Sequence, residues 1–342
     1  MKKAGNTDEP GYLWDTWFPV VIDNTKTSYE PLAQSINGEV IDSLDSTYRG
    51  CSNLEVSPDI PKSVTWMQST FMDCTSLKIA PVLPEGVEML RFAFDGCTSL
   101  IAAPQIPNSV KDMVGTFSGC TSLTNPSNIS ENAVDIGSVY EDTAITEAPY
   151  IPDSVVDMSY AFRGCASLVT PSNFPSNVEC ISYAYAFTAI TTAPSIPDSV
   201  LYMNGVFTSC SLLETATDFP PNVIDITAAY NSTAITKAPV IPDSVRHAAY
   251  TFAWTEITTA PVIPANVITA YQIFYGCYEL QGEVVIHAEL GDTYIDNIGN
   301  SRTYARPLEL FREYYTLSVV LTGTSSQLNE IAAQYDNVTV KQ

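Results

Sequence analysis

Hydrophobic residues recur along most of the chain at intervals of 22 or 23 residues. The unit at 100–123 reads Leu-Ile-Ala-Ala-Pro-Gln-Ile-Pro-Asn-Ser-Val-Lys-Asp-Met-Val-Gly-Thr-Phe-Ser-Gly-Cys-Thr-Ser-Leu. The leucine or isoleucine that closes each unit stands at Leu54, Leu77, Leu100, Leu123, Ile145, Leu168, Ile190, Leu213, Ile235, Ile257 and Leu280. Such a period predicts that each unit is one coil. A single coil cannot bury its own apolar positions, so neighbouring coils must stack around a shared core.

The residues inside a unit predict an extended segment, a turn and a second short segment. The stretch before each Ala-Pro pair is extended, because a residue that precedes proline is disfavoured in the α region. Pro-Asn-Ser at 107–109 and its equivalents then predict a turn. Val110, Met113 and Phe117 follow at spacings of three and four, which predicts a short strand leading into a helical turn. Proline cannot donate to a ladder, so we expect the continuous ladder in the Val-x-x-Met segment.

The two unit lengths have a visible cause. Long units end with Phe-x-x-Cys-x-x-Leu, as at 94–100. Short units end with an aromatic residue, two residues, threonine, one residue and isoleucine, as at 140–145. We interpret this as the deletion of one residue where the cysteine would sit. From Leu123 to Ile257 the two kinds largely alternate.

One recurring phrase carries a family resemblance. Ala-Phe-x-Gly-Cys-x-Ser-Leu, at 93–100 and 161–168, and Ile-Pro-x-Ser-Val, at 106–110, resemble the bacterial surface protein A-like (BspA-like) leucine-rich repeats. The resemblance covers roughly residues 40–282, and the period lies in the leucine-rich repeat range of about 20 to 29 residues. It implies a solenoid without enzymatic machinery, in exported or cell-surface bacterial proteins implicated in adhesion and protein binding.

Together these features predict an α/β-type fold: a right-handed leucine-rich repeat solenoid, made mostly of short strands and turns. Its coils, about eleven in number, occupy residues 41–282. Residues 1–40 contain no repeat but carry Trp14, Trp17 and Phe18. We expect this N-terminal cap segment to cover the exposed apolar edge of the first coil.

The C-terminal region at 283–342 also lacks the repeat. Residues 317–321 and 337–340 have the pattern of strands. Between them, one of two adjacent serines is suited to cap a helix that runs through 331–334. The sequence therefore predicts a small α/β cap at this end.

Composition and charge exclude several classes of partner. The 342 residues are 45% apolar, which is ample for a core, and include 15 Lys and Arg against 38 Asp and Glu, a net charge of −23. Such an acidic chain is unsuited to neutralising nucleic-acid phosphates or to docking on an anionic membrane. No apolar run reaches the length of about 18 residues that a spanning helix needs, so we predict no membrane insertion.

The N-terminus bears on localisation. Lys2 and Lys3 resemble the start of a signal peptide, but no apolar segment follows them. We expect an extracellular or cell-surface protein whose export signal has been removed from this chain. The alternative is an intracellular protein.

Seven of the eight cysteines keep the repeat register, and only Cys180 does not. They stand at Cys51, Cys74, Cys97, Cys120, Cys165, Cys210 and Cys277. No Cys-x-x-Cys pair occurs, so the main zinc signature is absent. We expect each thiol to lie inside a turn and to donate to a backbone carbonyl. Because neighbouring coils lie about 5 Å apart, disulfides along the column are the alternative.

The sequence predicts no enzyme, no cofactor and no metal site. His247 and His287 are the only histidines, and neither belongs to a recurring nucleophile or carboxylate constellation. The glycines are scattered singly and form no phosphate-binding loop. The Asp residues do not follow a calcium-loop pattern.

Two outward-facing columns vary in residue type and carry the candidate binding residues. One column lies two residues before the Phe or Tyr of each unit, which we call the aromatic marker; the other lies two residues after the Val. The predicted ligand-binding strip combines Tyr160, Tyr183, Tyr202, Asp225, His247 and Tyr250. Exposed aromatic residues are frequent in interface hot spots. In the alternative interpretation, these rings pack on neighbouring coils and the carboxylates only solvate the surface.

The predicted function is a non-enzymatic recognition or adhesion module that binds a protein or glycan through one face of the solenoid. The alternative is a structural spacer that displays other domains on a bacterial surface protein. A binder exposes a contiguous aromatic patch of several hundred Å², whereas a spacer buries those rings.

Overall fold

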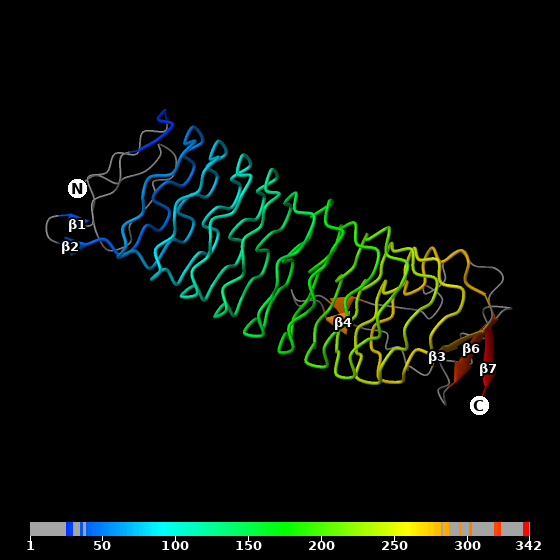
Figure 1. Cartoon of the computed structure of the whole chain (residues 1–342). Helices are drawn as coiled ribbons and strands as arrows, with labels where there is room; N and C mark the ends of the chain where they lie inside the picture. Colours follow the sequence, from blue (N-terminus) through cyan, green and yellow to red (C-terminus); the bar gives the residue numbers. More distant parts are fainter. Residues whose placement is uncertain are drawn as a thin grey trace. The chain divides into compact units, whose positions relative to one another are not determined.

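The computed structural model describes residues 25–29, 35–36, 39–281, 283–286, 294–295, 301–302, 318–322 and 338–341. The chain divides into two compact units, residues 1–178 (unit 1) and 179–342 (unit 2). Within each unit, successive coils lie side by side in chain order (Figure 1). Every leucine or isoleucine that closes a coil is buried, with at most 4% of its surface exposed. The prediction that coils stack around a shared core is therefore confirmed within each unit.

Regular strands occur only outside the coils. Unit 1 holds the antiparallel pair β1 (Ser35–Ile36) and β2 (Glu39–Val40). Unit 2 ends in a parallel sheet of β3 (Glu283–Ile286), β6 (Ser318–Thr322) and β7 (Val338–Lys341), and it also holds the antiparallel pair β4 (Tyr294–Ile295) and β5 (Ser301–Arg302).

Strands β6 and β7 lie within one residue of the two predicted C-terminal strands. The predicted helix between them, the N-terminal aromatics Trp14, Trp17 and Phe18, and His287 lie outside the described residues. The α/β cap, the domain boundaries and the right-handed sense of the coils stay predictions.

One position in each coil forms a parallel bridge to the same position in the next coil, and we call this set the ladder column. It lies two residues after the buried Val of each unit, a position that Ile41 and Ala133 occupy in two of the coils. In unit 1 it links Ser43, Trp66, Met89, Asp112, Asp135 and Asp157; in unit 2 it links Cys180, Tyr202, Asp225, His247 and Thr269. Near the Ala-Pro pairs, bridges join only separate pairs of coils, such as Ala102 with Asn125 and Thr192 with Thr215. The predicted continuous ladder in the Val-x-x-Met segment is confirmed.

The segment after the ladder column is a series of tight turns, so the predicted helical turn is wrong. In the coil of Phe94, the backbone amides alternate between two kinds of acceptor. The amides of Ala93, Asp95 and Cys97 donate to the carbonyl three residues back in the same coil. Those of Leu90, Phe92, Phe94 and Gly96 donate to carbonyls of the next coil. Phe92 and Gly96 have positive φ values of 54° and 70°. Two left-handed residues per coil are incompatible with a helix, and none occurs in the described part of the chain.

Two glycines at these left-handed positions are expected to differ in their tolerance of alanine. A Cβ at Gly119 has no atom closer than 3.5 Å, whereas one at Gly115 meets the Phe92 ring at 2.3 Å. Gly119→Ala should lower the free energy of unfolding only by the cost of a left-handed alanine, about 1–2 kcal/mol. Gly115→Ala should cost more, because the ring must also move. Urea denaturation of both variants tests this, and equal losses would contradict it.

The aromatic markers form a stacked column inside each unit. In unit 1, the rings from Tyr48 to Tyr140 follow one another with centroids 5.3–5.5 Å apart and planes within 11° of parallel. In unit 2, the rings from Tyr185 to Phe274 are separated by 5.5–6.4 Å. All of these rings are fully buried. Each ring therefore contacts the coil before it and the coil after it.

The cysteine column lies beside these rings, and its seven thiols are free, as is that of Cys180 in the ladder column. Cys74 Sγ donates to the carbonyl oxygen of Tyr48 at 3.0 Å, and Cys120 Sγ to that of Phe94 at 3.1 Å. The predicted thiol-to-carbonyl hydrogen bonds are present, and each joins a coil to the preceding one. They connect neighbouring coils in the interior, as the ladder column does at the surface.

Short coils keep this position by using threonine, which corrects the interpretation of the deletion. Thr143 lies three residues after Tyr140, the same offset as cysteine in a long coil. Its buried Oγ1 donates to the carbonyl of Tyr140 at 2.9 Å and lies 3.2 Å from Cys165 Sγ. Thr188, Thr233 and Thr255 make the equivalent bond. The missing residue therefore falls after the cysteine position, on the outer edge of the coil.

Candidate functional site

The ladder column of unit 2 brings three predicted site residues together. Tyr202 bridges to Asp225, and Asp225 bridges to His247, so their side chains occupy the same place on successive coils. We call these residues the ladder strip. Tyr202 is 45% exposed, and the other two are half-buried.

The polar members of the ladder strip are held by local hydrogen bonds. Asp225 Oδ1 accepts from the backbone N–H of Thr227 at 2.8 Å. His247 Nδ1 lies 3.1 Å from the Thr269 hydroxyl. Asp225 Oδ2 and His247 Nε2 are the atoms that these bonds leave unused. The strip thus presents an exposed phenol beside a carboxylate and an imidazole that hydrogen bonds orient.

The remaining predicted residues sit at left-handed positions and only partly reach solvent. Tyr183 and Tyr250 have φ values of 56° and 57°. The Tyr183 ring lies across Gly205, where a Cβ would come within 2.2 Å of it. Tyr250 meets Tyr271 edge-on, with ring centroids 5.2 Å apart. One side of each of these two rings therefore packs on a neighbouring coil, as the alternative interpretation predicted, and their role in binding stays a prediction.

Tyr160 is the one predicted residue that belongs to unit 1, where it is 39% exposed. The ladder column of that unit has a different character, because three of its residues are the aspartates Asp112, Asp135 and Asp157. Arg91 Nη2 lies 2.7 Å from Asp112 Oδ2 and 3.9 Å from Asp135 Oδ2. Burial raises the pKa of Asp135, and the neighbouring carboxylates raise it further. The ladder column of unit 1 thus combines one exposed aromatic residue, Trp66, with three aspartates, whereas that of unit 2 places a tyrosine directly before an aspartate and a histidine.

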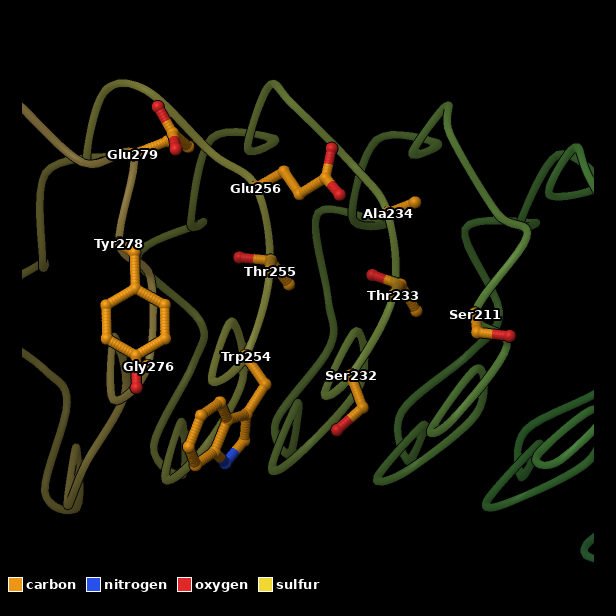
Figure 2. Close-up of a pocket in the computed structure, with 10 residues that line it drawn as sticks. All are labelled: Ser211, Ser232, Thr233, Ala234, Trp254, Thr255, Glu256, Gly276, Tyr278 and Glu279. Atoms are coloured by element: carbon orange, nitrogen blue, oxygen red, sulfur yellow. The ribbon is translucent and has the colours of Figure 1, made fainter.

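Unit 2 also contains a groove that the sequence analysis missed. It has a volume of about 620 Å³ and lies where two short coils follow one another between two long ones (Figure 2). The short coils supply 232–234 and 254–256, and the long coils supply Ser211 on one side and Tyr278 with Glu279 on the other. The signal in the sequence is the pair of consecutive 22-residue steps from Leu213 to Ile257. Each step removes one residue from the outer edge, so two adjacent deletions hollow that edge.

Two features of the residues that the structure describes concern metal ions and membranes. These residues contain no group of three or more His, Cys, Asp or Glu side chains arranged to hold a metal ion. Among the same residues, no helix has the length and apolar character to cross a bilayer.

Comparison with known proteins places these coils in a family. The BspA type leucine rich repeat region matches the chain in six copies, over residues 43–165 and 138–258. The chain belongs to the BspA-type leucine-rich repeat family. The resemblance seen in the Ala-Phe-x-Gly-Cys-x-Ser-Leu phrase is thereby confirmed. No curated protein matches this BspA-type chain.

Solved structures share the fold of this BspA-type protein at low identity. A leucine-rich repeat protein from Bacteroides ovatus is 19% identical to this chain, with a TM-score of 0.53. The match covers 77% of this chain and 63% of the other, so this chain spans less than two thirds of that protein's length. The pneumococcal vaccine antigen PcpA is 13% identical with a TM-score of 0.55, over 94% and 91% of the two chains. A leucine rich cell surface protein from Faecalibacterium prausnitzii is 19% identical with a TM-score of 0.47, over 90% of each chain. The first two similarities, with TM-scores above 0.5, show the fold alone.

Proposed function

We propose that this protein is a non-enzymatic recognition module of a bacterial cell surface, which binds a partner protein through the ladder strip. The observation that carries the proposal is the alignment of Tyr202, Asp225 and His247 on successive coils, with the Tyr202 ring 45% exposed. A repeat fold presents such a column on a rigid support, so binding costs little conformational entropy.

The chemistry of the strip suits a protein ligand. Tyrosine supplies a large contact area and a hydroxyl, and it is enriched at interface hot spots. The carboxylate and imidazole beside it offer hydrogen bonds that fix the orientation of the partner. Membership of a family of surface repeat proteins supports the same role. A glycan is the alternative ligand, and the test below includes both.

Tyr202→Ala is expected to weaken capture of the ligand by about tenfold or more, which is the usual effect of removing an interface anchor. Its melting temperature should not change, because the ring lies outside the core. The measurement is an array of host matrix proteins and glycans probed with the whole chain, followed by titration of any ligand found. Tyr150→Ala is the matched control, because Tyr150 is 69% exposed and lies outside the ladder column.

Equal capture by Tyr202→Ala and the parent chain would remove the ladder strip from the proposal. A ligand found only among glycans would overturn the choice of a protein partner. The absence of any captured ligand would favour the structural spacer, which needs no binding face.

A further inference from the structure

The groove of unit 2 has the dimensions of a binding site and is separate from the ladder strip. Its volume of about 620 Å³ lies within the range of about 300–1,000 Å³ that is typical of ligand sites. None of the three residues of the ladder strip lines it. Its floor carries the hydroxyls of Thr233 and Thr255, but both already donate hydrogen bonds within their own coils, to the carbonyls of Tyr230 and Phe252.

An indole ring forms a fixed platform at one side of the groove. Trp254 sits at a left-handed position, with a φ of 59°, and is 46% exposed. A Cβ at Gly276 would come within 2.4 Å of the indole, so one face of the ring lies against the glycine backbone of the next coil. Tyr275 and Tyr278 meet the ring edge-on, with centroids 5.0 and 6.0 Å away. Because the Gly276 backbone covers one face of the indole, a ligand would approach the ring from the opposite face.

Two carboxylates give the groove a negative charge. Glu256 and Glu279 are exposed, and their side chains lie on the same side of the groove in Figure 2. Neither forms an ion pair among the described residues, and no Lys, Arg or His lines the groove. The Trp254 indole lies at the opposite end of the groove from these carboxylates (Figure 2), so the ring quadrupole attracts a cation at one end and the two charges attract it from the other. A neutral ligand would leave these carboxylates without a partner.

We propose that this groove binds an arginine side chain from a basic segment of a partner protein. The guanidinium is planar and charged, so it can lie flat on the Trp254 indole while the negative charges of Glu256 and Glu279, at the other end of the groove, attract its positive charge. An ammonium group is a compact point charge and lacks the flat face that matches an indole. The net charge of −23 attracts basic segments over a longer range. The proposal adds a second contact site to the proposed function and does not depend on the ladder strip.

The test uses short peptides that differ at a single central residue: arginine, lysine or citrulline. Citrulline keeps the flat shape of arginine but carries no charge. Binding to the whole chain is measured by tryptophan fluorescence and by calorimetry at low salt. The arginine peptide should bind about tenfold more tightly than the citrulline peptide and measurably more tightly than the lysine peptide. Equal binding of arginine and citrulline, or of arginine and lysine, would overturn the assignment.

Variants separate the groove from non-specific attraction to an acidic chain. Trp254→Leu and the double variant Glu256→Gln/Glu279→Gln should each weaken arginine-peptide binding by about tenfold. Trp66→Leu is the control for the ring, because Trp66 is 47% exposed but lies in unit 1. Glu214→Gln/Asp218→Asn is the control for charge, since it also removes two negative charges, but from exposed residues of unit 2 that do not line the groove. Both controls should bind like the parent chain.

Two further readouts keep the result interpretable. Trp254→Phe retains an aromatic face and should keep part of the affinity, which guards against a folding defect in Trp254→Leu. Tyr202→Ala should leave peptide binding unchanged, so failure of the ladder strip and failure of the groove are distinguishable. If Trp254→Leu binds the arginine peptide as tightly as the parent chain does, the proposal is wrong.

Discussion

Replacing Phe117 with alanine is expected to lower the free energy of unfolding of unit 1 by about 3–5 kcal/mol. Phe117 is fully buried, and its ring stacks between those of Phe94 and Tyr140, with centroids 5.5 and 5.3 Å away. The variant therefore loses apolar burial and two aromatic contacts, and it leaves a cavity between three coils. Urea denaturation followed by circular dichroism measures the loss.

The same variant should also broaden the unfolding transition. In a repeat protein the coils are held together by nearest-neighbour interfaces, and Phe117 contributes to two of them. Phe117→Leu is the matched control, since it keeps most of the volume and should lose about 1–2 kcal/mol. A loss below about 1 kcal/mol for Phe117→Ala would show that the ring column is not a main source of stability.

The second large effect is a loss of stability at alkaline pH, caused by the buried thiols. Burial raises the pKa of the Cys165 thiol to about 11 and that of Cys120 to about 12. Burial also raises the pKa values of Cys74, Cys97, Cys210 and Cys277. In the unfolded chain these thiols ionise near pH 9. Above that pH the unfolded state has released protons that the folded state retains, so rising pH favours unfolding.

The sign and size of the effect follow from this difference. The stability contributed by each thiol is complete below about pH 8.5 and declines up to the folded pKa. Each thiol lowers the free energy of unfolding by up to about 1.4 kcal/mol per pH unit. For Cys165 this amounts to about 2–3 kcal/mol between pH 9 and 11. Urea denaturation at successive pH values, with a reducing agent present, measures the slope.

Cys165→Thr provides the control, because threonine already occupies the equivalent position in the four short coils. By analogy with Thr143, the threonine hydroxyl would donate to the carbonyl three residues back, that of Phe162, and it does not titrate. The variant should fold normally and lose stability less steeply above pH 9. An unchanged slope would show that this thiol does not contribute to the alkaline effect.

The stacked coils could be predicted because a repeated apolar position reports burial directly. Leu100, Leu123 and their equivalents recur at a fixed interval and are all buried. The continuous ladder was also predictable, since proline excludes it from the Ala-Pro segment. The turn after the ladder was not, because the spacing of Val110, Met113 and Phe117 fits both a helix and the observed turns. Left-handed residues distinguish the two, but these positions hold Gly115 in one coil and Tyr160 or Tyr183 in others.

The candidate site also has a part that the sequence predicted and a part that it did not. Sequence register alone placed Tyr202, Asp225 and His247 in one column, and the structure joins them by bridges. The packing of Tyr183 and Tyr250 depends on which residue stands in the next coil, Gly205 or Tyr271. The groove depends on two successive short coils and on an indole at a left-handed position. Neither condition is visible when each repeat is aligned separately.

The alternation of cysteine and threonine has a consequence for how such a surface changes. Because the deleted residue lies beyond the Cys or Thr position, a coil can be shortened or lengthened without disturbing the ring column or the marker leucines. The width of the groove at the outer edge therefore changes in steps of one whole coil. A single residue inserted after Thr233 would refill half of it, and a deletion after Cys277 would extend it by one coil. In this architecture, insertions and deletions act as discrete steps that resize a surface cavity, whereas in most folded domains they damage the interior.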